Sequence, residues 1–303
     1  MTDAVGRAGP SGVQRRHDGA RKYTVPVILS TAFSSPLSPW SVVPAVLALV
    51  SYALAWPGGA STRAQQALTL AWVAHGTALF AQLLGVGLPG DGIRFGFATA
   101  LSSTVWLVLA VHAVESRFVP VPAVRRLLAG LGGAATLLVL LFPGEGAIHA
   151  VSPWAPLHWL MGFASYGLFG AAVLHAIWLD RAERAMRSRR VPAPGAGVLP
   201  LLLLEQLTFR FVAAGFLVLS GAIALGSWFM ATWTWDHKTV FSVLAWAVFA
   251  GLLGGRRAFG WRGRLATRWL YVGSVLLLLA YVGSRFVFEV LLHRPAAVTG
   301  LVS

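Results

Sequence analysis

Eight separate runs of about 20 mainly apolar residues dominate this sequence. A helix needs about 20 such residues to cross the hydrocarbon core of a bilayer. The predicted spans are 40–57, 66–87, 93–114, 122–142, 155–179, 207–230, 238–255 and 268–292. No soluble domain fits between them. The sequence therefore predicts an all-α fold, a polytopic membrane helix bundle with about eight transmembrane helices.

Composition agrees with a membrane protein and limits its chemistry. Charged residues make up only 11% of the chain, against about 25% in soluble domains. The chain has no cysteine, which excludes disulfides, Cys-ligated metals, covalent attachment of haem and thiol redox chemistry. Any metal would have to be held by histidine, by carboxylates or within a bound cofactor.

The formal net charge of +14 at first suggests nucleic-acid binding. The basic residues, however, are gathered in short loops between apolar spans, whereas a nucleic-acid site needs a continuous basic stripe. The expected partner of these loops is the lipid bilayer with its anionic headgroups, and no nucleic-acid partner is expected.

The loop arginines also predict the orientation. Cytoplasmic loops carry an excess of Lys and Arg, and the loops after spans one, three, five and seven hold most of them here. They are Arg63; Arg117, Arg125 and Arg126; Arg181, Arg184, Arg187, Arg189 and Arg190; and Arg256, Arg257, Arg262, Arg264 and Arg268. We expect a multi-pass protein of the bacterial cytoplasmic (inner) membrane with both termini extracytoplasmic, although five basic residues in the N-terminal tail favour the opposite orientation.

Three parts of the chain are expected. Residues 1–38 form an N-terminal tail whose Gly, Arg and Ser content favours disorder, or a start site assigned upstream of the true one. Residues 39–293 form the transmembrane domain, and residues 294–303 form a C-terminal tail.

The polar break before span seven is unusual for a membrane protein, because it holds Trp233, Trp235, Asp236 and His237. Paired tryptophans there can stack on a flat aromatic ligand. They can equally form the aromatic belt found at headgroup depth. Asp236 can orient a metal-binding histidine as a hydrogen-bond acceptor, or it can cap the helix that starts near Lys238.

Three further histidines are candidate ligands. His75 lies near the middle of span two, where a polar ring is rare and is either functional or bonded to a Ser, Thr or carbonyl of a neighbouring helix. His158 opens span five between two tryptophans and is followed by small residues that admit a flat ligand or another helix. His149 lies in the preceding loop and is either a ligand or solvated.

Several imidazoles at one membrane face, together with the tryptophans, suit an iron porphyrin bound non-covalently. Zinc also binds imidazole, but the aromatic residues fit a planar apolar ligand better. Arg285 lies four residues before Glu289, so the two share a helix face. Arg285 either forms an internal ion pair with Glu289 or neutralises an anion such as a haem propionate.

Enzymatic motifs are missing from the sequence. It contains no Gly-rich phosphate loop, no Ser-His-Asp arrangement and no HExxH pattern. We therefore expect a non-enzymatic protein.

Three segments resemble one known family. WTWDHKTVFSVLAW, PLHWLMGFASYGLFGAAVLHAIWLDR and FGWRGRLATRWLYVGSVLLLLAYVGSRF are similar to the cytochrome c assembly family of membrane proteins, the CcsA, CcmC and HemX-like group, and to its compact YpjD-like branch. The resemblance covers residues 40–292. The first segment lacks the WGxxW half found in longer members, and the chain has no large extracytoplasmic domain.

The resemblance implies haem binding on the outer face. Trp233, Trp235 and Asp236 map to the platform, and His75, His149 and His158 are the histidines that fit, with His75 and His158 as the expected iron ligands. It implies a role in cytochrome c assembly or haem homeostasis and partners among assembly or other membrane proteins. Two alternatives remain open: a transporter or accessory subunit for a metal ion or small molecule, and a membrane partner that docks a cytoplasmic protein.

Overall fold

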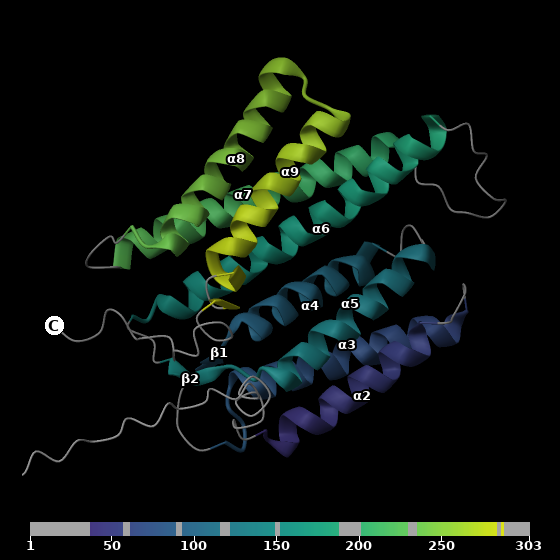
Figure 1. The fold of residues 1–303 in the computed structure, drawn as a ribbon, viewed down its shortest axis with the longest axis vertical. Coiled ribbons are helices and arrows are strands. Elements are labelled where there is room, and N and C mark those ends of the chain that lie inside the picture. Colours follow the sequence, from purple (N-terminus) through teal and green to yellow (C-terminus); the bar gives the residue numbers. More distant parts are fainter. Residues whose placement is uncertain are drawn as a thin grey trace, which may run out of the picture.

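A computed structural model describes residues 37–56, 61–88, 93–115, 122–148, 152–187, 201–229, 235–283 and 286–287. Eight α-helices lie within these ranges and correspond in order to the eight predicted spans (Figure 1). They are α2 (Pro39–Ala55), α3 (Thr62–Leu83), α4 (Phe97–Glu115), α5 (Pro122–Leu141), α6 (Ala155–Arg187), α7 (Leu201–Phe229), α8 (His237–Phe259) and α9 (Gly263–Leu278). The prediction of an all-α membrane helix bundle is confirmed. Residues 1–36 and 288–303, which include most of both predicted tails, lie outside the described residues.

Six of these helices are long and apolar enough to cross a membrane: α4 to α8, and α9 together with the five-residue π-helix η1 (Leu279–Gly283) that continues it. The other two differ from them in specific ways. Helix α2 has 17 residues, which rise only about 25 Å at 1.5 Å per residue. Helix α3 is long enough but carries Gln65, Gln66, His75 and Gln82 along its length.

The helices form two groups of four, α2–α5 and α6–α9, each with its own apolar core (Figure 1). Helix α4 packs against α6 and joins the groups. Small residues allow this close approach, because a Cβ added to Gly167 or Gly170 of α6 would lie 2.6 Å or 2.7 Å from side-chain atoms of Leu107 or Val108. Part of the small-residue stripe after His158 therefore serves helix packing.

Two tryptophans tie α3 to α4. The indole N–H of Trp72 donates to the backbone oxygen of Trp106 at 3.1 Å, and that of Trp106 donates to the backbone oxygen of Trp72 at 3.0 Å. The two rings are stacked with centroids 5.0 Å apart. This reciprocal pair fixes the position of α3 along α4.

A short antiparallel pair of strands, β1 (Ile93–Phe95) and β2 (Glu145–Ile148), closes one end of the bundle, with Ile93 opposite Ile148. The third predicted span begins at residue 93, but residues 93–95 form strand β1, and helix α4 begins only at Phe97. We call this end, which also holds the starts of α6 and α8 and the end of α7, the sheet end (Figure 1). The opposite end, with the turn between α8 and α9, is the arginine end.

Helices α6 and α7 extend past their predicted spans at the arginine end. The 33 residues of α6 rise about 50 Å, so its last turns project beyond a bilayer core. The extra turns are held by charge: Glu205 near the start of α7 lies 3.1 Å from Arg256 and 3.7 Å from Arg262. Apolar length alone misses these polar extensions.

Candidate functional site

Four of the predicted site residues lie at the sheet end: His158 in the first turn of α6, and Trp235, Asp236 and His237 at the start of α8. His75 lies instead within α3, in the other group of helices. His149, Trp233 and Arg285 lie outside the described residues.

His158 is half-buried and oriented by α7. Its Nδ1 atom lies 2.9 Å from the backbone oxygen of Ala222. Because a carbonyl oxygen only accepts hydrogen bonds, this contact places the ring proton on Nδ1 and the lone pair on Nε2. Metal-binding histidines commonly have their tautomer and ring direction fixed by a backbone carbonyl in this way. The Nδ1 contact of His158 is therefore of the kind that orients metal-binding histidines.

The ring of His158 also rests against a glycine of α7. A Cβ added to Gly226 would lie 2.8 Å from Cε1 and 3.1 Å from Nδ1 of His158. Real Cβ atoms do not come so close, so a larger residue at 226 would displace the ring. One turn after His158, by contrast, a Cβ added to Gly162 would meet nothing within 4 Å.

Exposed tryptophans surround the start of α6. Trp154, just before the helix, is stacked on Trp228 near the end of α7, with centroids 6.4 Å apart and an angle of 21° between the rings. The two side chains are 51% and 78% exposed, and Trp235 before α8 is 69% exposed. Flat apolar surfaces therefore lie open at the same end of the bundle as His158.

Asp236 caps α8. Its carboxylate accepts a hydrogen bond from the backbone N–H of Thr239 at 2.8 Å, as the second interpretation of this residue required. Partial burial alone raises the pKa of the Asp236 carboxyl, but the hydrogen bonds from Thr239 and the charges of Lys238 and His237 outweigh burial and hold the pKa below its usual value. The cap fixes where α8 begins and so positions Trp235 and His237 beside it.

His75 is buried, with 1% of its surface exposed. Its Nδ1 atom lies 2.9 Å from the hydroxyl of Tyr52 in α2, and its Nε2 atom lies 2.7 Å from the hydroxyl of Ser102 in α4. Both ring nitrogens thus have a hydroxyl partner, which is the neighbouring-helix bonding that the sequence left open.

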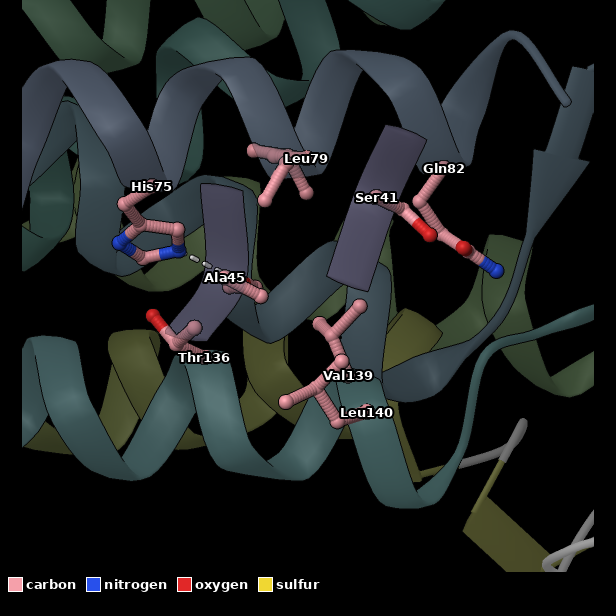
Figure 2. A pocket seen from close by; sticks show the side chains of 10 residues that line it. Ser41, Ala45, His75, Leu79, Gln82, Thr136, Val139 and Leu140 are labelled. Carbon is pink, nitrogen blue, oxygen red and sulfur yellow. Dashed lines mark hydrogen bonds between the residues drawn. The ribbon is translucent and has the colours of Figure 1, made fainter. Parts of the chain in front are cut away.

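A small cavity lies beside this ring (Figure 2). Side chains of α2, α3, α4 and α5 line it, among them the polar residues Ser41, Gln82 and Thr136. Its volume is about 10 Å³, which is room for a single water molecule. A porphyrin does not fit next to His75 unless these helices separate, whereas His158 is half-buried at the end of the bundle that carries the exposed tryptophans.

Comparison with known proteins identifies the family. The family model described as cytochrome C assembly protein matches residues 39–292. This chain belongs to the cytochrome c assembly family. The match agrees with the range and family expected from the three sequence segments, and it assigns all eight described helices to the family's membrane domain.

Three relatives are similar to this chain over different shares of their lengths. The inner membrane protein YpjD of Escherichia coli (strain K12) is 28% identical over 264 residues, which are 82% of this chain and 98% of that protein. The cytochrome c biogenesis protein CcsA of Synechococcus sp. (strain CC9902) is 29% identical over 158 residues, 44% of this chain and 52% of that protein. An uncharacterized 28.8 kDa protein of Azospirillum brasilense is 34% identical over 145 residues, 46% of this chain and 53% of that protein. No solved structure matches the chain significantly.

Sequence reasoning missed three residues that lie at or beside this site. Trp228 was treated as part of a span, although its position one short loop before the WTWD segment was a usable signal. Ala222 and Gly226 carried no signal, since a backbone oxygen and a missing side chain become partners of His158 only once α6 and α7 pack together.

Proposed function

We propose that this protein binds haem non-covalently at the sheet end of its helix bundle, with His158 as an iron ligand. The binding would serve cytochrome c assembly or haem homeostasis. The observation that carries the proposal is the contact between His158 Nδ1 and the oxygen of Ala222, which gives the ring the tautomer and direction of a metal-binding histidine beside exposed tryptophans.

Different residues around His158 would contact different parts of a bound porphyrin. Trp154 and Trp228 offer a stacked aromatic surface, and the exposed Trp235 lies at the same end of the bundle. The resemblance of the WTWD segment adds Trp233 to the proposed platform. His75 and His149 are the candidates for a second iron ligand, and His75 can serve only after α2, α3 and α4 rearrange. Arg285 is positioned in the sequence to neutralise a propionate.

Bound haem would supply an iron centre whose potential and reactivity its axial ligands set. In this role the protein would bind and orient haem, and it would form or break no covalent bond. The gathering of arginines at one end supports a cytoplasmic arginine end and an extracytoplasmic sheet end by the positive-inside rule.

Names of relatives support a location and a set of partners. One relative is named an inner membrane protein and another a cytochrome c biogenesis protein. These names support a location in the bacterial inner membrane, and the loop arginines support extracytoplasmic termini. Its proposed partners are haem and membrane proteins of cytochrome c assembly.

Absorption spectroscopy of the detergent-purified protein with added haemin tests the proposal. The wild type should show a Soret band and, after dithionite reduction, sharp bands typical of a histidine-ligated haem. His158→Ala should lose most of this absorbance, and added imidazole should restore part of it to His158→Gly, because the free ligand fills the space that the side chain left.

His175→Ala is the matched control. His175 lies on the same helix, is buried with 7% of its surface exposed, and has its own Nδ1 atom 2.7 Å from a backbone oxygen, that of Ala171. This variant should keep the wild-type spectrum. A wild type that stays colourless with haemin, or equal spectra for His158→Ala and wild type, would contradict the proposal.

A further inference from the structure

Three arginines line a cavity at the arginine end, between α6 and α9. They are Arg184 of α6 and Arg264 and Arg268 of α9, and they share the cavity with Asp180, Thr267 and Tyr271. Its volume is about 130 Å³, roughly that of four water molecules at about 30 Å³ each. The cavity is thus large enough for one compact anionic group.

The carboxylate in this cavity is held by hydroxyl groups. Thr267 donates to one oxygen of Asp180 at 3.0 Å, and Tyr271 donates to the other at 2.8 Å. These contacts run between α6 and α9, so Asp180 joins the two helices and orients the hydroxyls on the cavity wall.

Positive charge exceeds negative charge on the lining by two, with three arginines against Asp180. Arg264 and Arg268 are four residues apart, a spacing at which like charges repel on a helix. Other carboxylates at this end have different partners, since Glu183 pairs with Arg187, and Glu205 pairs with Arg256 and Arg262. A bound anion would relieve the repulsion at the cavity.

Aromatic residues lie at the same end of the bundle as the cavity. Phe259, Trp261 and Trp269 form a continuous stack at this end, with neighbouring centroids 6.2 Å and 6.4 Å apart. Tryptophans gather at membrane interfaces in this way. On the same helix as the arginines, Leu265 and Val272 are 47% and 46% exposed and can contact acyl chains.

We propose that this cavity binds the phosphate of an anionic phospholipid, with Arg184, Arg264 and Arg268 as donors and the acyl chains along α9. Guanidinium groups suit phosphate because their planar donors contact two oxygens at once. Basic pockets between transmembrane helices are a recognised form of anionic lipid site. The inference does not depend on haem binding.

Native mass spectrometry of the full-length protein, titrated with phosphatidylglycerol in detergent, tests this site. The wild type should retain phosphatidylglycerol in preference to phosphatidylcholine of the same acyl chains, because the choline cation is repelled. Arg264→Gln combined with Arg268→Gln should weaken the retention of phosphatidylglycerol roughly 10- to 30-fold, on the scale of the attraction per arginine near a lipid surface.

Arg126→Gln combined with Arg257→Gln is the matched control. Both residues are exposed and lie outside the cavity lining, so the variant loses the same charge and should bind lipid like the wild type. Equal loss in both double variants would overturn the site, as would equal retention of the two lipids. Millimolar inorganic phosphate that raises the melting temperature of the wild type, with no selective retention of phosphatidylglycerol, would overturn the assignment to a lipid.

Discussion

His158 of α6 is oriented by Ala222 of α7, whose backbone oxygen lies 2.9 Å from the Nδ1 atom of the ring. One turn further along α7, Gly226 leaves the space in which the ring lies. The direction of the proposed iron ligand therefore depends on two α7 residues that do not themselves touch the ligand site.

Gly226→Ala is expected to weaken haemin binding by about 10- to 100-fold, the range found when the groups that orient a metal ligand are disturbed. The added Cβ, 2.8 Å from Cε1, pushes the ring away from its position. Haemin titration followed at the Soret band measures the change. Gly251→Ala, which adds the same atom into open space on α8, should bind haemin like the wild type; a matching loss there would show that the effect is not specific to His158.

Trp228→Ala is expected to weaken haemin binding about 2- to 12-fold, since an aromatic pair contributes about 0.5–1.5 kcal/mol beyond its buried area. Trp228→Phe should retain most of the affinity because a flat ring remains against Trp154. The same titration serves as the measurement. Trp40→Ala, which removes a 67% exposed tryptophan in the first turn of α2, should change little; unchanged binding in Trp228→Ala would remove this residue from the site.

Asp236→Ala is expected to lower the free energy of unfolding by about 1 kcal/mol at pH 7, the usual effect of removing a helix cap. Asp236→Asn should be nearly neutral at that pH, because asparagine caps as well as aspartate. Thermal unfolding in detergent, followed by circular dichroism, gives both values. Equal stability of the alanine variant and the wild type would contradict the assigned role.

The same cap predicts a dependence on pH. The pKa of Asp236 is lower in the folded protein than in the unfolded chain, where it is about 3.9. Its stabilisation is therefore complete above the unfolded value and is lost as pH falls through the folded value. Between pH 6 and pH 3 the melting temperature of the wild type should fall further than that of Asp236→Asn, which does not titrate at this position.

Tyr52→Phe is expected to destabilise the protein by about 1–3 kcal/mol, because it leaves the buried Nδ1 atom of His75 without its hydroxyl partner. Thr77→Ala is the control. It removes an exposed hydroxyl of α3 that donates to the backbone oxygen of Val73 in the same helix, and it should change stability by less than about 0.5 kcal/mol. Thermal unfolding compares the two. A shift in the haem absorption bands of Tyr52→Phe would in addition assign iron ligation to His75.

Apolar run length predicted the order of the eight helices within the described residues, because most of the runs meet the length that crossing a bilayer requires, as six of these helices do. It failed where polar contacts extend a helix or shorten it. Helix α7 starts six residues before its predicted span, at Leu201, in a region where Glu205 pairs with two arginines of distant sequence. The pairing of Ile93 with Ile148 likewise depends on two loops that meet only in the folded bundle.

Residue type identified His158, Trp235 and Asp236 as unusual, but it could not choose among their possible roles. The role of Asp236 follows from one contact with Thr239. The hydrogen-bond partners of His75 come from α2 and α4, and the sequence around residue 75 does not identify them. Pairwise geometry between helices is the information that a single sequence lacks.

The reciprocal hydrogen bonds between Trp72 and Trp106 hold α3 and α4 together, so the two helices move as one rigid unit. A slide of even one residue, about 1.5 Å along the axis, would break both indole bonds together, so His75 and Ser102 travel with each other in any rearrangement of the bundle. Helix α2, which meets His75 through the hydroxyl of Tyr52, takes no part in this pair. A movement of α2 away from α3 would therefore uncover His75, the one histidine of α3, and leave both indole bonds intact.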